Sequence, residues 1–253
     1  MEIIKFIKTK NNTYELHLDN ESILNLYDET IINFGLLLDK TIDSEKLSEI
    51  ASYNDDLDAY YQSLKYINKK MRSELEISKY LRKKEFSTRT INEAIKLLKE
   101  KGYLDNDKYI ISYINDQIKL TNNGPEKIKD NLISLGFNAD EIVIDHDFIQ
   151  KIDKLIQKKI NMNKKSNTYT LKSNISSYLI NLGYSKTSFI DKLNEIKVDD
   201  SSIIKKDYEL LERRYAKKYS DNKLKSFIKD KLYKKGYNIE DINEVINDGD
   251  VYW

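Results

Sequence analysis

The stretch GPEKIKDNLISLGF, residues 124–137, decides how the chain is organised. It holds the only proline of the 253-residue sequence and two of its seven glycines. Proline suits the first position of a helix, because its fixed φ is helical and no N–H donor is needed there. Glycine suits the position after the last turn, where a left-handed conformation ends the helix without Cβ strain. The stretch therefore predicts one complete helix over 125–135.

The same spacing returns elsewhere in the chain. In the opening stretch, Ile128 and Leu132 share one helix face, and Gly136 follows four residues later with aromatic Phe137 behind it. Three further segments repeat this order, with glutamate replacing glycine in the first: Ile77–Leu81–Glu85–Phe86, Ile175–Leu179–Gly183–Tyr184 and Ile228–Leu232–Gly236–Tyr237. A self-similarity of about 50 residues indicates stacked supersecondary units that share a core.

Each unit is predicted to hold three helices, the second of which ends at the capping position. The expected helices are 57–70, 73–84 and 88–101, then 106–120, 125–135 and 139–149, then 151–162, 168–182 and 186–196, then 201–219, 221–235 and 239–247. They define repeat 1 (57–103), repeat 2 (104–149), repeat 3 (150–197) and repeat 4 (198–253). Asn138, Ser185 and Asn238 are the expected N-caps of the third helices in repeats 2, 3 and 4.

The first 56 residues form a different region. Apolar residues alternate with polar ones on both sides of an Asn pair, which predicts a β-hairpin, and Ile23 to Tyr27 predicts a third strand. A short helix ending at Gly35 and another with Asp43 or Ser44 as N-cap are expected to follow. The predicted fold is thus mostly α, an elongated and curved array of three-helix repeats with a small N-terminal β-meander.

Composition excludes several classes of protein. Without cysteine there are no disulfides or thiolate metal sites, and no long apolar run or signal-peptide pattern is present. The two histidines, His17 and His146, do not form a ligand set, and no nucleotide-binding or nucleophile motif is found. We therefore expect a cytoplasmic protein that is not an enzyme, needs no metal or cofactor and does not contact membranes.

Charge is uneven although the formal net charge is only +1. Residues 1–70 are acidic, whereas 151–186 and 213–235 are rich in lysine and arginine. Such stretches are either solvated helix faces or contact surfaces for phosphate or an acidic partner.

A helix–turn–helix DNA-binding protein is one alternative, since three-helix units with a glycine turn resemble such modules. Phosphate proximity disfavours acidic third helices, however, and the expected helices 139–149 and 239–247 carry several carboxylates and no Lys or Arg. Only the expected helix 88–101, with Arg89, Lys96 and Lys99, suits that role. A helical adaptor for another protein is the second alternative.

Two further segments carry a family resemblance. YINKKMRSELEISKYLRKKEF (66–86) and LLKEKGYLDNDKYIISYI (97–114), followed by the opening stretch, resemble in order and spacing the RecX family, the modulators of the RecA recombinase. The resemblance covers residues 60–140 best.

The resemblance implies a monomeric, non-enzymatic regulator that lies in the groove of a RecA filament on single-stranded DNA and limits ATP hydrolysis and strand exchange. Its contacts, with recombinase or with the DNA in the filament, are expected at the following cations: Arg72, Lys127, Lys129, Lys158, Lys159, Lys164, Lys165, Arg213, Arg214, Lys217 and Lys218.

Overall fold

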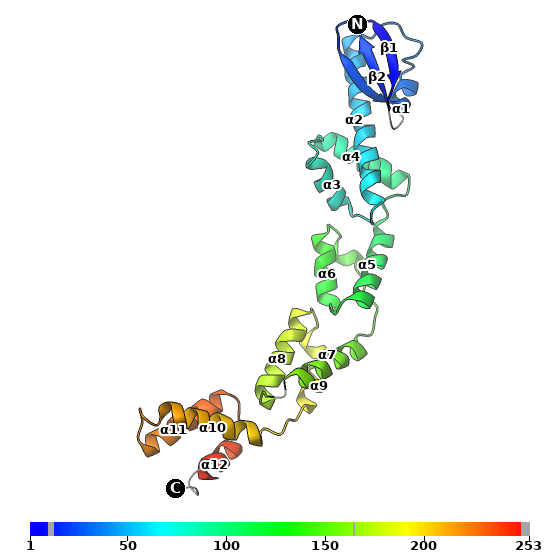
Figure 1. Ribbon diagram of the computed structural model, residues 1–253. Helices are drawn as coiled ribbons and strands as arrows, with labels where there is room; N and C mark the ends of the chain where they lie inside the picture. The colour runs from blue at the N-terminus through cyan, green and yellow to red at the C-terminus, as the bar shows by residue number, and fades with distance from the viewer. Residues whose placement is uncertain (10–12, 164, 249–253) are drawn as a thin grey trace. The chain divides into compact units, whose positions relative to one another are not determined.

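A computed structural model describes residues 1–9, 13–163 and 165–248 (Figure 1). It divides into two compact units, Met1–Tyr113 with Leu132–Ile142, and Ile114–Asn131 with Val143–Trp253. The predicted fold class is confirmed in that a three-stranded sheet is followed by helices throughout.

The N-terminal sheet is an antiparallel meander in the order β1-β2-β3, formed by Ile3–Lys8, Thr13–Leu18 and Ile23–Tyr27. Its inward residues Leu16 and Leu26 are fully buried, which confirms the period-two pattern. The Asn pair expected at the β1–β2 turn lies outside the described residues. Helix α1 (Asp28–Asn33) follows, and Gly35 has the left-handed φ expected of a helix stop.

Helix α2 (Ser44–Ile67) replaces two expected helices by one, and Asp43 is its N-cap. The sequence contains no glycine or proline between the two expected helices, so nothing interrupts the backbone hydrogen bonds there. Ile50 packs in the core of the sheet, whereas Ala59 and Tyr60 pack in the core of repeat 1. The one helix thus serves two cores.

Repeat 1 continues with α3 (Glu74–Arg82) and α4 (Thr88–Glu100), near the expected bounds. A capping box begins α3, in which Ser73 accepts from the Glu76 N–H while the Glu76 carboxylate accepts from the Ser73 N–H. Ile77 and Leu81 form the fully buried stripe of α3.

Repeat 2 departs from the prediction. Helices α5 (Asn106–Leu120) and α6 (Pro125–Ser134) form as expected, but the helix predicted over 139–149 does not. A single 3₁₀ turn, η1 (Ala139–Glu141), is followed by non-helical chain up to α7. Three consecutive β-branched residues, 142–144, lie among carboxylates there, and both features weaken a helix. The Asn138 side chain correspondingly donates to Glu141 instead of capping a helix.

Repeat 3 contains α7 (Ile149–Met162), α8 (Thr168–Asn181) and a broken third helix. The helix predicted over 186–196 is a 3₁₀ turn, η2 (Lys186–Ser188), and a short α9 (Ile190–Glu195), and Ser185 makes no capping bond.

Repeat 4 contains α10 (Ser201–Tyr215), α11 (Asp221–Lys234) and α12 (Ile239–Asp248). Asn238 caps α12 as predicted, accepting from the Asp241 N–H at 2.8 Å. Helix α10 ends four residues earlier than expected, and a turn fills the difference.

The predicted helix stops are confirmed. Gly102, Gly136, Gly183 and Gly236 have φ of +75°, +97°, +84° and +87°. Glu85, which stands where the other copies have glycine, adopts the same conformation with φ +67°. The position therefore imposes the left-handed backbone, whichever residue occupies it.

Three of these four glycines, Gly136, Gly183 and Gly236, also form the contact between successive repeats. A Cβ on Gly136 would lie 3.0 Å from the Leu75 side chain, at the start of α3. A Cβ on Gly183 would overlap the backbone of Lys127 at the start of α6, and one on Gly236 would overlap the Tyr169 ring at the start of α8. In each case the end of a second helix abuts the beginning of the second helix of the preceding repeat.

Candidate functional site

Arg72 is held by its own chain. Its guanidinium lies 3.9 Å from the centroid of the Tyr66 ring and pairs with Glu76 at 2.9 Å. Tyr66 is in turn stacked on Tyr80, and the Arg72 side chain is only 14% exposed. Arg72 thus joins the end of α2 to the start of α3, and its Nε has no hydrogen-bond partner among the described residues.

Glu76 is the centre of this cluster. Burial raises the pKa of its carboxyl, but the Ser73 N–H and the Arg72 guanidinium outweigh burial and hold that pKa below its usual range. Tyr109 of α5 donates to Glu76 at 3.3 Å, so the cluster also reaches repeat 2. The Arg72 charge is therefore paired within the protein, although the sequence predicts Arg72 as a contact to the recombinase or its DNA.

The cations of α4 are also engaged. Arg89 donates to both carboxylate oxygens of Asp56, at 2.9 and 3.0 Å, and Lys99 pairs with Glu74 at 2.8 Å. Two of the three cations that would read DNA in a helix–turn–helix arrangement thus face the protein. A helix–turn–helix module in repeat 2 would need a third helix there, and that helix does not form.

Lys127 of α6 and Lys159 of α7, both predicted as contacts, lie against the last turn of α8. Lys127 at the start of α6 donates to the Asn181 carbonyl at 3.4 Å. Lys159 in the last turn of α7 lies 4.0 Å from the centroid of the Tyr178 ring. Cations at this end complement the helix dipole, which gives both lysines a structural role.

The remaining lysines predicted in this part of the chain have different environments. Lys158 and Lys165 are exposed, and Lys129 is half-buried. Lys164 lies outside the described residues.

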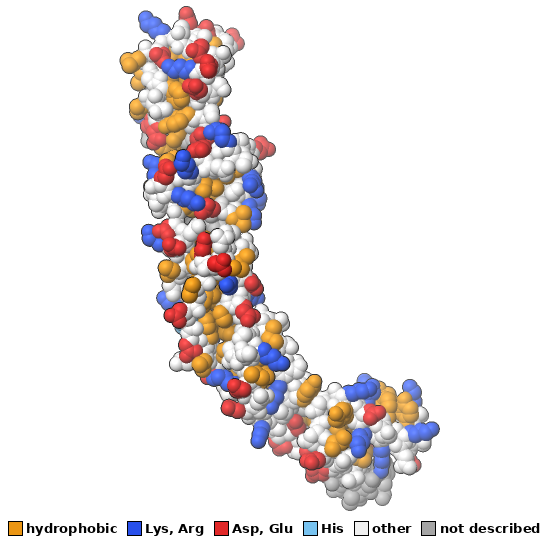
Figure 2. Space-filling view, turned by 180° about the vertical axis from the view of Figure 1, so that it is seen from behind, with side chains coloured by type: hydrophobic (Ala, Val, Ile, Leu, Met, Phe, Trp, Pro, Cys, Tyr) orange, Lys and Arg blue, Asp and Glu red, His pale blue; other side chains and the backbone are white. Residues whose placement is uncertain are grey.

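Arg213 and Arg214 occupy the last turn of α10, and Lys217 and Lys218 lie in the turn that follows it. All four are exposed, and Arg213 pairs with Glu209 at 3.4 Å. Figure 2 shows Lys and Arg side chains beside hydrophobic ones over repeat 4, at the lower right.

Sequence reasoning missed the aromatic residues among these cations. Tyr215, Tyr219 and Phe227 pack against one another, with ring centroids 4.7 Å apart for Tyr215–Phe227 and 4.8 Å for Tyr219–Phe227. The sequence does contain a signal for this cluster, because Tyr215 and Tyr219 are four residues apart and lie next to four cations.

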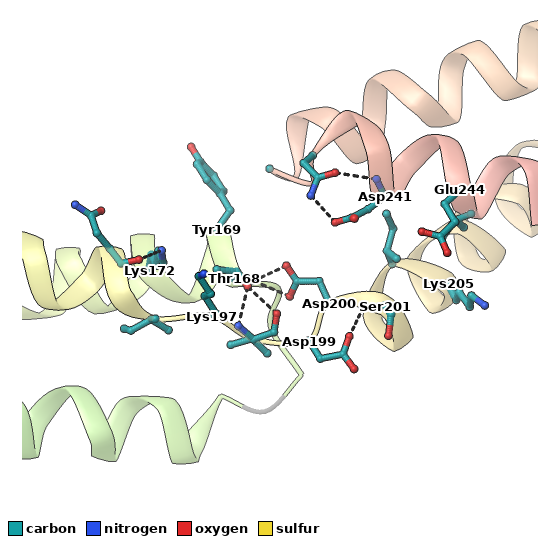
Figure 3. A pocket seen from close by; sticks show the side chains of 17 residues that line it. Thr168, Tyr169, Lys172, Lys197, Asp199, Asp200, Ser201, Lys205, Asp241 and Glu244 are labelled. Carbon is teal, nitrogen blue, oxygen red and sulfur yellow. Dashed lines mark hydrogen bonds between the residues drawn. The ribbon is translucent and has the colours of Figure 1, made fainter.

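A groove of about 650 Å³ runs between repeats 3 and 4, at the start of α8 and the segment before α10 (Figure 3). Asp200 accepts from the Thr168 N–H with both carboxylate oxygens, at 2.9 and 3.2 Å. It thereby satisfies a backbone donor at the N-terminal end of α8. Three lysines and four carboxylates line the groove: Lys172, Lys197, Lys205, Asp199, Asp200, Asp241 and Glu244. This mixture of charges does not select an anion or a cation.

The part of the chain that the structure describes contains no group of three or more His, Cys, Asp or Glu residues placed to hold a metal ion. None of its helices combines the length and hydrophobicity required to cross a bilayer.

Comparison with known proteins gives consistent matches. Residues 59–98 match the family described as "RecX, first three-helix domain". Regulatory protein RecX of Streptococcus pyogenes serotype M3 is 30% identical over 257 residues, covering 96% of this chain and 97% of the relative. Its counterpart in Lactococcus lactis is 31% identical over 264 residues, covering 97% of each chain.

A solved structure shares the fold. The crystal structure of a regulatory protein RecX superposes with a TM-score of 0.66 at 20% identity, covering 78% of this chain and 100% of the other. The resemblance carried by residues 60–140 thus extends over nearly the whole sequence, and the chain belongs to the RecX family of regulatory proteins.

Proposed function

We propose that this protein binds the RecA filament assembled on single-stranded DNA and restrains its ATP hydrolysis and strand exchange. The proposal rests on family membership over nearly the full length, with regulatory proteins as the relatives. The observation that carries it in this chain is the density of exposed, uncompensated cations in repeats 3 and 4.

The physical basis is charge complementarity. A filament on DNA presents phosphate and carboxylate groups, and opposite charges arranged along a surface guide association and fix its register. Lys158, Lys165 and Arg214 are exposed, and none has an ion-pair partner within the described ranges. These residues, with Lys217 and Lys218, are the predicted contacts that remain available to a partner.

ATP hydrolysis by the RecA protein of the same organism, measured on circular single-stranded DNA, tests the proposal. We expect hydrolysis to fall as the protein is titrated in, at fewer than one copy per recombinase subunit, because one bound regulator affects a stretch of filament. Unchanged hydrolysis and filament length across the titration would rule the proposal out.

Charge-reversal variants test whether the exposed lysines of repeat 3 contact the filament. The double variant Lys158→Glu, Lys165→Glu should weaken the suppression of ATP hydrolysis and leave the thermal unfolding midpoint unchanged. Lys83→Glu, Lys84→Glu is a matched control, because both lysines are exposed and follow α3 in repeat 1. Equal effects of the two double variants would place the contact elsewhere.

A further inference from the structure

The aromatic cluster of repeat 4, formed by Tyr215, Tyr219 and Phe227, lies at one end of the α10–α11 pair. The Tyr219 and Phe227 rings are stacked with an interplanar angle of 28°, and all three residues are half-buried. Of the three rings, only Tyr215 packs against the buried core of this repeat, which includes Ile228 and Leu232. Rings whose only role is packing are usually buried in a core, whereas these three rings are partly exposed to solvent.

Cations surround the cluster. The Lys218 Nζ lies 5.6 Å from the Tyr219 ring centroid, and the Lys231 Nζ lies 5.3 Å from the Phe227 centroid. Lys223 and Lys231 stand four residues before and after Phe227, which places all three on one face of α11.

Six exposed cations of α10, α11 and the turn between them are called the cationic rim here, and none of the six has a carboxylate partner within the described ranges. They are Arg214, Lys217, Lys218, Lys223, Lys231 and Lys234. Their neighbours differ, since Arg213 pairs with Glu209, Lys235 pairs with Asp207 and Lys229 donates to Asn243. The cations without a carboxylate partner therefore lie on the same two helices and turn as the rings, and two of them, Lys218 and Lys231, lie over ring faces.

We propose that the aromatic cluster and the cationic rim bind single-stranded DNA, with bases stacked on the rings and phosphates paired with the rim. The inference rests on the proposed function and deepens it, because it names DNA as the component of the filament that repeat 4 contacts. Every base has an aromatic face, so this recognition is independent of sequence.

The aromatic rings favour single-stranded DNA over an acidic protein surface as the binding partner. Carboxylates would engage the rim but gain little from the aromatic faces, whereas unpaired bases use both. Duplex DNA hides the faces of its bases by stacking, so it too would use only the rim. The ammonium groups over Tyr219 and Phe227 are held by weak cation–π attraction and can swing to phosphate, which uncovers the rings for bases.

Fluorescence anisotropy of a labelled oligothymidylate, titrated with the full chain and without recombinase, tests the inference. Tyr219→Leu and Phe227→Leu should each weaken binding about tenfold, since each removes one stacking face. Tyr219→Phe retains the ring and should bind like the unaltered protein. Tyr233→Leu is the matched control, because Tyr233 is 63% exposed on the same helix but outside the cluster.

The rim is tested through salt dependence. Lys223→Gln and Lys231→Gln should each reduce the slope of log affinity against log salt by about 0.7, as expected for one phosphate contact on a single strand. Arg213→Gln should change the slope less, because its guanidinium already pairs with Glu209.

Two results would overturn the inference. One is failure of the unaltered protein to bind the oligonucleotide at low salt. The other is unchanged DNA binding by both leucine variants, and if suppression of recombinase hydrolysis were weakened at the same time, repeat 4 would contact protein. Ring-dependent DNA binding without any effect on hydrolysis would instead support this inference and reject the proposed function.

Discussion

Gly183, which ends α8, lies directly against Lys127 in the first turn of α6, so that a Cβ on the glycine would overlap the lysine backbone. The Glu126 N–H donates to the Gly183 carbonyl at 3.1 Å, and the Gly124 N–H donates to the Leu182 carbonyl at 2.6 Å. Gly183 thus ends one helix and also forms the contact with the first turn of α6 in the preceding repeat.

Replacing Gly183 should therefore destabilise the fold for two reasons. Gly183→Ala has to hold a left-handed backbone with φ +84°, at a cost of roughly 1–2 kcal/mol, and to displace Lys127 as well. We expect a loss of about 3 kcal/mol or more in the free energy of unfolding, measured by urea denaturation.

Two other glycines separate these effects. Gly102→Ala carries the conformational cost alone, since a Cβ there meets nothing within 4 Å at φ +75°. Gly124→Ala carries the steric cost alone, since its φ is not left-handed but its Cβ would lie 2.5 Å from the Gly183 carbonyl oxygen. Similar losses for Gly102→Ala and Gly183→Ala would contradict the second role of Gly183.

Glu85 offers a stabilising change. Its left-handed φ of +67° strains a residue that carries a Cβ, and Glu85→Gly removes that strain. After the greater freedom of glycine in the unfolded chain is deducted, we expect a gain of about 0.5–1 kcal/mol in urea denaturation. Glu85→Ala should be nearly neutral, and a gain as large as that of glycine would show that the glutamate side chain causes the strain.

Stability should depend on pH through Glu76. Because its pKa is lowered in the folded state, the ionised carboxylate stabilises the fold above the unfolded pKa, and this contribution is lost as pH falls through the folded pKa. Glu76→Gln should be less stable than the unaltered protein by about 1–3 kcal/mol at pH 7. The difference should shrink as urea denaturation is repeated below about pH 4.

Glu74→Gln serves as the comparison for Glu76, because Glu74 also begins α3 but pairs with Lys99 at the surface. Its effect at pH 7 should be small. A Glu76→Gln difference that stayed constant from pH 7 to pH 3 would show that the charge of Glu76 contributes nothing.

Asn167 links repeats 3 and 4. Its Oδ1 accepts from the Thr170 N–H at 2.8 Å as the N-cap of α8, while its Nδ2 donates to the Lys235 carbonyl at 2.9 Å. Asn167→Ser retains a capping oxygen but loses the donor, so we expect a loss of about 1 kcal/mol in thermal or urea unfolding.

Asn238→Ser is the control for that loss. Asn238 caps α12 in the same way, but its amide group donates to Asp241 of its own helix and is exposed. The serine variant should change stability by only a few tenths of a kcal/mol. An equal loss at both positions would mean that the Lys235 bond adds nothing to the fold.

The sequence alone determined the fold class, the second helix of every repeat and its stop. Those features depend on neighbours in the chain: an Ile–Leu stripe on one face, proline at a first turn and glycine or Glu85 at a left-handed position. The spacing of the repeats predicts a helix over 139–149, yet the β-branched run and the carboxylates prevent a helix from forming before α7. The spacing of apolar residues gives no measure of the low helix propensity of the residues between them.

Only the tertiary structure decided which cations are available and where the repeats touch. Arg72 lies between Tyr66 and Glu76, and Lys127 faces the end of α8, although both appear in the sequence as free charges. The aromatic cluster likewise forms only when Phe227 of α11 meets the end of α10. Ion pairing, ring contacts and the space left for a Cβ depend on groups far apart in the chain, and the order of residues does not encode those distances directly.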